Sequence, residues 1–274
     1  MRIALAQMYC RWGDVAGNLR RMAAHVRDAA ARHAELVVFP ECSAHGMWKD
    51  HMVRLAAESP DGPIARRMGR CARRHRIAVG FGLAEKTASK PFNSYVLIGP
   101  DGRTLGVYRK NFVTPLERDF FRRDSRRPVF RLGRLRVGIA ICADCCHREL
   151  LAGYARRGVD LVLMPHAWDA DPILKGGRIA SFRSTAHMVD VHARGLVMRY
   201  RTHKEMLDAF VGRLAPICRR QGLYGAFVNQ VGQPHPLIPF VGPSFVLAPS
   251  GETVVRSTSK KEALILADIP DLSR

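Results

Sequence analysis

Short apolar runs alternate along the chain with stretches in which apolar residues recur every three or four positions. The short runs are typical of strands and the longer periodic stretches of helices. The strand-like runs are RIALAQM (2–8), LVVF (36–39), IAVGFGLAE (77–85), SYVLIG (94–99), TLGVYRK (104–110), PVFRL (128–132), LRVGIAIC (135–142), DLVLMP (160–165), GAFVNQ (225–230), SFVLAPSG (244–251), TVV (253–255) and ALILADI (263–269). This alternation predicts an α/β fold.

The periodic stretches predict four helices. Asp14 can cap a helix that runs to about His33, and an arginine-rich helix follows the break at 60–63. A third helix is expected from about 148 to 157, and a fourth begins near 203. No low-complexity linker divides the chain, which predicts a single domain over 1–274 with a longer-than-usual insert at about 169–209.

Composition narrows the class of protein. Hydrophobic residues make up 47% and charged residues 25% of the 274 positions, which is ordinary for a folded enzyme. No run of eighteen apolar residues exists, so no membrane span is expected. The chain enters a strand pattern without an apolar leader, and its seven cysteines are irregularly spaced. Both features predict a cytoplasmic protein with reduced thiols.

The formal net charge is +20, which would attract nucleic acid or another polyanion. The basic residues, however, are spread along the whole chain in pairs and do not form a stripe interleaved with aromatic residues. This distribution favours a solvated surface and argues against nucleic acid as a partner.

Three reactive side chains each follow a strand-like run. They are Glu41 after LVVF, Lys110 after GVYR and Cys142 after VGIAI. Residues at strand ends project into a common crevice in α/β folds. A base next to a thiol can take its proton, and a cation can stabilise a thiolate or an oxyanion. The backbone N–H of Ala143 could donate a second hydrogen bond to that oxyanion. Together these residues indicate nucleophilic catalysis.

At these residues the sequence resembles the nitrilase superfamily of carbon–nitrogen hydrolases. The segments FPE (39–41), YRK (108–110) and GIAICAD (138–144) look like its three signatures, and GPDGRTLGVYRK, VGPSFVLAPSGE and AFVNQVG look like further segments of it. The resemblance covers roughly 1–168 and 222–268. The sequence differs from the family pattern in two places. The Phe-Pro pair that often follows a few residues after the position of Cys142 is missing, and ICRRQ (217–221) in the last predicted helix does not match the family.

The resemblance implies a four-layer αββα sandwich and a set of roles. Glu41 would be the general base, Lys110 the oxyanion stabiliser and Cys142 the nucleophile, with Glu117 as a second glutamate that orients the substrate. His166, Trp168 and Asp169 follow the next strand, where pocket walls occur in this family, so we expect them to contact substrate. The family uses neither metal nor organic cofactor, and its subunits form homodimers or higher homo-oligomers.

The segment CADCCH (142–147) has other readings. A structural zinc site commonly needs a second pair of ligands, which the sequence lacks. A redox CxxC pair opens a helix, whereas Cys142 ends a strand. A haem anchor would require export of the protein, and the missing apolar leader argues against export. We therefore predict one nucleophile, with Cys145 and Cys146 as buried neighbours on the following helix and Asp144 as the cap of that helix.

The sequence thus predicts hydrolysis of an amide or carbamoyl amide in a small molecule through a thioester. A nitrilase or an acyltransferase would use the same residues, so both remain open. A third alternative is a nucleic-acid-binding or scaffold protein on the same fold, which the net charge motivates.

Overall fold

The computed structural model describes residues 1–46, 52–114, 117–168, 202–235 and 238–270. Its first sheet has six strands in the order β14-β1-β2-β3-β4-β5. Their bounds are β1 (Arg2–Gln7), β2 (Leu36–Val38), β3 (Ala78–Glu85), β4 (Phe92–Ile98), β5 (Thr104–Arg109) and β14 (Ala263–Asp268). The strands β1, β2 and β3 are parallel, and the remaining pairs are antiparallel.

A second sheet of six strands has the order β13-β12-β9-β8-β7-β6. Its strands are β6 (Phe130–Leu132), β7 (Leu135–Ile139), β8 (Leu161–Pro165), β9 (Tyr224–Val228), β12 (Phe245–Leu247) and β13 (Thr253–Arg256). The central strands β7, β8 and β9 are parallel. A separate pair is formed by β10 (Val231–His235) and β11 (Ile238–Val241).

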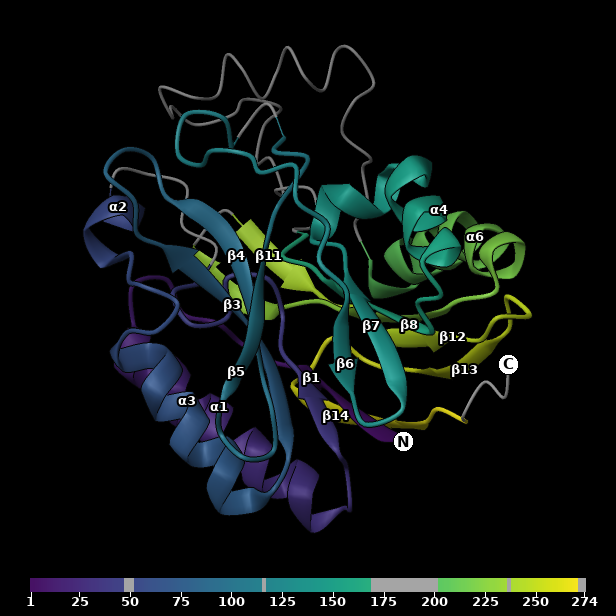
Figure 1. The fold of residues 1–274 in the computed structure, drawn as a ribbon, viewed down its shortest axis with the longest axis horizontal. Helices are drawn as coiled ribbons and strands as arrows, with labels where there is room; N and C mark the ends of the chain where they lie inside the picture. The colour runs from purple at the N-terminus through teal and green to yellow at the C-terminus, as the bar shows by residue number, and fades with distance from the viewer. Residues whose placement is uncertain (47–51, 115–116, 169–201, 236–237, 271–274) are drawn as a thin grey trace.

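Helices cover the outer face of each sheet, as Figure 1 shows. The helices α1 (Val15–Ala31) and α3 (Pro63–His75) pack on the first sheet, and α4 (Arg148–Arg156) and α6 (His203–Gln221) pack on the second. A short helix, α2 (Met52–Ala56), and a 3-10 helix, η1 (Cys142–Cys146), complete the described elements. A continuous core joins the inner faces of the two sheets. The prediction of a four-layer αββα sandwich is confirmed.

Local chemistry explains where the helices begin and end. Asp14 Oδ1 accepts a hydrogen bond from Gly17 N at 2.8 Å and so caps α1, as predicted. Proline occupies the start of α3, where its missing N–H costs nothing, and Arg76 ends this helix in the left-handed conformation. The strands β2, β8 and β9 are buried along their whole length, which explains their unbroken apolar runs.

Several elements differ from expectation. The sequence pattern gave no sign of α2, of η1 or of the β10–β11 pair. Within the proposed insert, 169–201 lies outside the described residues, and its last residues form the first turns of α6. Among the described residues, no helix is long and apolar enough to cross a membrane.

Candidate active site

Glu41 lies in a turn that follows β2 and is fully buried. Its Oε2 accepts a hydrogen bond from Ala167 N at 2.9 Å, just beyond the end of β8. Its own carbonyl oxygen accepts a bond from Gln230 Nε2 at 2.8 Å. The neighbouring strand approaches so closely that a Cβ at Gly82 would lie 2.1 Å from Cys42 N, so only glycine fits there. The two sheets therefore hold this carboxylate from both sides.

Lys110 follows β5, and only 1% of its side chain is exposed. Its Nζ donates to Glu41 Oε1 at 2.7 Å and to Glu117 Oε1 and Oε2 at 2.8 and 2.9 Å. The ammonium group has three protons, and these three oxygens accept all of them. The structure thus brings Glu41, Lys110 and Glu117 together, although 69 residues separate the first two.

A buried asparagine connects the two carboxylates. Asn93 Nδ2 donates to Glu41 Oε1 at 2.7 Å and to Glu117 Oε1 at 3.4 Å. Thr114 N donates to Glu117 Oε2 at 3.0 Å and fixes its other oxygen. The sequence analysis did not select Asn93. An amide at the start of a buried strand was the available signal, because a buried polar side chain needs partners.

Cys142 sits where the chain leaves β7 and turns into η1. Its φ of 49° places it in the left-handed region, which a side chain other than glycine adopts at a cost of roughly 1–2 kcal/mol. Such strained positions cluster at functional sites. The residue is buried, with 7% of its surface exposed.

Electrostatics favour a protonated thiol in the resting site. Burial, followed by the negative charge of Glu41, raises the pKa of Cys142 well above its ordinary value, and the charge of Lys110 offsets only part of this. Burial by itself would lower the pKa of Lys110, but Glu117 and Glu41 raise it well above its ordinary value. Burial opposes ionisation of Glu117, yet the charge of Lys110 keeps its pKa lowered. A nucleophilic role for this thiol would therefore require a base that removes its proton during the attack.

Asp144 ties the nucleophile turn to the segment after Lys110. Its Oδ1 accepts from Asn111 N and Phe112 N at 3.2 and 2.8 Å, and its Oδ2 accepts from Ile141 N and from the hydroxyl of Tyr108 at 3.0 and 2.7 Å. Burial raises its pKa to about 6, so the carboxylate is ionised at neutral pH. The prediction that Asp144 caps the helix after it was wrong: the N-cap of α4 is His147, which makes no side-chain cap bond, and Asp144 lies within η1, where it accepts from the backbone N–H of Ile141.

We expect Asp144→Asn to loosen this connection. Each carboxylate oxygen accepts a backbone N–H, so an amide NH2 group faces a backbone donor in either orientation. One buried donor then loses its partner, which should lower the free energy of unfolding by about 1–3 kcal/mol in urea titrations. Asp101→Asn, at an exposed turn, is the matched control. Equal stability of the two variants would contradict this role.

The cysteine cluster corrects one prediction. Cys145 is buried and its Sγ donates to Ala140 O at 3.3 Å, whereas Cys146 is exposed and its Sγ accepts from Arg213 Nη1 at 3.1 Å. The prediction that both would be buried was therefore wrong for Cys146. The segment is a 3-10 helix with three residues per turn, so Cys142 and Cys145 share a side and Cys146 turns away.

The predicted oxyanion and substrate residues have the following positions. Ala143 is partly exposed in the first turn of η1, where helix N–H groups lack intrahelical partners. His166 is buried against Phe227, and burial lowers its pKa to about 3. Trp168 is half-buried, with its backbone held by Asn229 at 2.9 and 3.0 Å. Asp169 lies outside the described residues. Their contacts with substrate remain predictions.

The model of the carbon–nitrogen hydrolase family matches residues 2–186. The chain belongs to this family. It is 28% identical over 173 residues to a probable nitrilase of Schizosaccharomyces pombe and 31% identical over 172 residues to an (R)-stereoselective amidase of a Pseudomonas species. These matches cover 61% and 63% of this chain and only 64% and 62% of those two proteins.

Two further comparisons extend over almost the whole chain. A nitrilase of Pyrococcus abyssi is 24% identical over 273 residues, which covers 98% of this chain and 89% of that protein. Among solved structures, an amidase of the nitrilase superfamily from Nesterenkonia superposes with a TM-score of 0.78 at 22% identity. This superposition covers 99% of this chain and 91% of the amidase, and it supports the fold of this family member.

Proposed function

We propose that this carbon–nitrogen hydrolase cleaves an amide-type, non-peptide C–N bond in a small molecule through a thioester on Cys142. The observation that carries the proposal is the buried Lys110 ammonium, bonded to both Glu41 and Glu117, beside a thiol in a strained turn. A mutant of an amidase of the same fold, from Nesterenkonia, shows covalent addition of the acetamide moiety of fluoroacetamide at its active-site cysteine. That precedent favours an amide as the substrate class.

In the first half-reaction Glu41 takes the proton of Cys142 as the sulfur attacks the carbonyl carbon. The carbonyl oxygen becomes an oxyanion, which Lys110 and the N–H of Ala143 stabilise. All three protons of Lys110 are bonded at rest, so we propose that one of its two contacts with Glu117 is released to the oxyanion. The C–N bond then breaks, and the departing amine takes the proton from Glu41.

In the second half-reaction Glu41 removes a proton from water, and the hydroxide attacks the thioester carbon. The C–S bond breaks, the sulfur regains a proton and the carboxylic acid leaves. Glu117 holds Lys110 in place throughout, and Asn93 holds both carboxylates toward that lysine. We further propose that these steps take place in the reducing cytoplasm. The seven cysteines, all of them free, support this location.

Trapping the acyl-enzyme tests this function. The protein is incubated with small amides, carbamoyl amines and nitriles and quenched in acid, and its intact mass is compared with that of Cys142→Ala. We expect a mass gain equal to the acyl group minus one hydrogen on the wild type, release of ammonia, and neither in the variant. Cys146→Ala is the matched control, because this neighbouring thiol is exposed and could be modified without any catalytic role. An adduct that persists in Cys142→Ala would refute Cys142 as the nucleophile.

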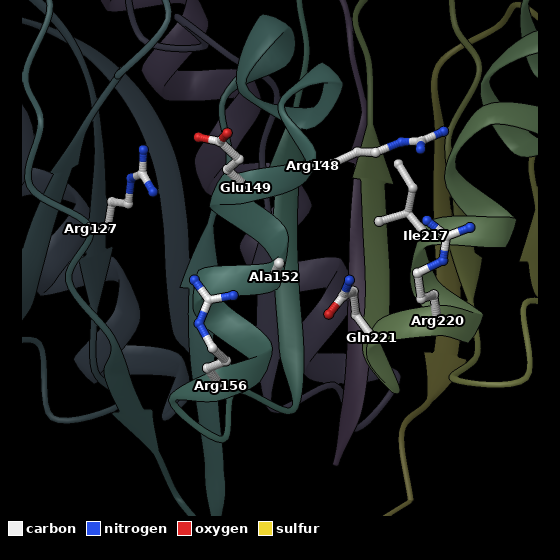
Figure 2. A pocket seen from close by; sticks show the side chains of 8 residues that line it. All are labelled: Arg127, Arg148, Glu149, Ala152, Arg156, Ile217, Arg220 and Gln221. Carbon is white, nitrogen blue, oxygen red and sulfur yellow. The ribbon is translucent and has the colours of Figure 1, made fainter.

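We also propose that two copies associate through the outer faces of α4 and α6. A cavity of about 330 Å³ lies between these helices, and Figure 2 shows Glu149 on this face among Arg127, Arg148, Arg156 and Arg220. Glu149 makes no ion pair with any described residue of its own chain. A two-fold interface is self-complementary, so each copy could offer Glu149 to an arginine of the other.

Sedimentation measures this association. We expect wild-type protein to sediment at twice the 30.6 kDa chain mass. Glu149→Arg should shift it toward the monomer, because the charged side chains of both faces would then all be arginines and would repel each other. Glu252→Arg makes the same charge change at an exposed position directly before β13, and this variant should remain dimeric. A dimer unaffected by Glu149→Arg would place the interface elsewhere.

A further inference from the structure

A basic groove lies on the opposite helical layer, between α1 and α3. It encloses about 590 Å³, and small side chains, Ala23 and Cys71 among them, form part of its lining. Its cationic side chains are Arg20 and Arg27 of α1 and Arg67, Arg70 and Arg74 of α3, and His75 of α3 also lines it. The helical repeat explains why they converge. Arg67, Arg70 and Arg74 are three and four positions apart, so they lie along one face of α3.

This groove corrects the picture of dispersed charge. In the sequence Arg66-Arg67 and Arg73-Arg74 are isolated pairs, but a helix turns the two members of each pair in different directions. One member of each pair enters the groove, and arginines of α1 face it from the other side. The fold thus gathers on one surface charges that the sequence scatters.

The groove lacks an internal counter-charge. None of the described residues that line it is acidic, and α3 contains neither aspartate nor glutamate. Arg27 pairs with Asp28 at 3.1 Å, but the other four arginines make no ion pair with the described residues. Like charges crowded together raise the free energy of the folded protein, and a bound anion would relieve that repulsion.

The arrangement favours a linear chain of phosphates. Arg67 and Arg74 are about 10 Å apart along the helix axis, given a rise of about 1.5 Å per residue. Guanidinium groups bind phosphate oxygens in a bidentate manner. No aromatic side chain other than the His75 ring lines the groove, so bases have little to stack on. No large apolar side chain lines it either, which argues against insertion into a membrane surface.

We propose that this groove binds the phosphate backbone of a single-stranded nucleic acid without reading its sequence. Phosphate contacts position a protein on nucleic acid, whereas base contacts specify a sequence. A groove between two packed helices admits one strand more readily than a duplex. The site is separate from Cys142 and its partners, so this proposal does not depend on the hydrolase activity.

Salt-dependent binding tests the proposal. The wild-type affinity for a fluorescent oligothymidylate is measured by anisotropy over a series of salt concentrations. Five arginine contacts predict a slope of log K against log salt of about −3.5 for a single strand. The triple variant R67Q/R70Q/R74Q leaves two contacts and should have a slope of about −1.4. At about 0.1 M salt this difference corresponds to roughly 100-fold weaker binding.

A matched triple variant separates the groove from general charge. R131Q/R136Q/R256Q also removes three positive charges, but from exposed arginines of β6, β7 and β13, and it should bind like the wild type. Circular dichroism melts establish that both variants are folded. An equal loss in the two triples, a wild-type slope near zero, or binding to vesicles of anionic lipid in place of oligothymidylate would each overturn the proposal.

Discussion

Lys110→Met is expected to lower the free energy of unfolding by about 3–5 kcal/mol, because it leaves two buried carboxylates without their cation. Glu41 and Glu117 are at most 2% exposed, and Lys110 Nζ lies 2.7 and 2.8 Å from them. The same change removes the proposed donor to the oxyanion, and loss of such a donor costs about 10²–10³ in kcat in other enzymes. Urea unfolding and ammonia release measure the two effects.

The pH dependence of this loss has a definite sign. In the wild type Lys110 lowers the pKa of Glu117 below its ordinary 4.5, so this pair stabilises the fold above that pH and the contribution fades as the pH falls. The difference in free energy of unfolding between Lys110→Met and the wild type should therefore be largest at neutral pH and should shrink below about pH 4.5. Lys90→Met is the control, because Lys90 is exposed and donates only to a surface carbonyl. A difference that widens in acid would contradict the ion-pair account.

Glu41→Gln is expected to separate reactivity of the thiol from turnover. Glutamine keeps the shape and can still accept the bond from Lys110 when its NH2 group faces Ala167 N, but it cannot take a proton from Cys142. Loss of a general base reduces the rate by about 10²–10⁴. Glu41 also raises the pKa of Cys142, so its neutral replacement should lower that pKa and increase the thiolate fraction at a given pH.

Two measurements on the same protein check this prediction. The rate of alkylation of Cys142 by iodoacetamide is followed by intact mass across a pH series, and ammonia release is followed with an amide substrate. We expect the alkylation profile of Glu41→Gln to shift to lower pH while ammonia release nearly disappears. Glu252→Gln, which removes an exposed carboxylate, should change neither. A profile that shifts to higher pH would mean that Glu41 does not act on the thiol through its charge.

The two helical layers divide the remaining proposals between them. The α4–α6 face carries both signs of charge, which suits contact with a second copy. The α1–α3 groove carries cations alone, which suits a polyanion. Both faces lie outside the sheets that hold Glu41 and Lys110, as Figure 1 shows. Variants of either face should therefore leave amide hydrolysis unchanged when the chain stays folded.

The sequence by itself predicted the strands of the two large sheets, the four long helices and the three reactive positions, but not α2, η1 or the β10–β11 pair. Apolar runs without interruption marked β2 and β8 because both faces of these strands are buried, and Asp14 marked the start of α1 because a carboxylate there accepts a free N–H. Glu41, Lys110 and Cys142 were recognisable because each reactive side chain comes at or just after the end of a strand-like run. These features depend on residues that are close in sequence, so a short stretch of sequence is enough to predict them.

Only the tertiary structure decided which of these groups meet. The bond between Asn93 and Glu41, the anchoring of Asp144 on the segment after Lys110 and the outward turn of Cys146 depend on strand order and helix type. The same holds for the groove, where α1 and α3 pack side by side and bring together arginines that are dozens of residues apart. Such contacts join residues far apart in the chain, and their hydrogen bonds and charges arise only when two sheets and their helices pack around one core.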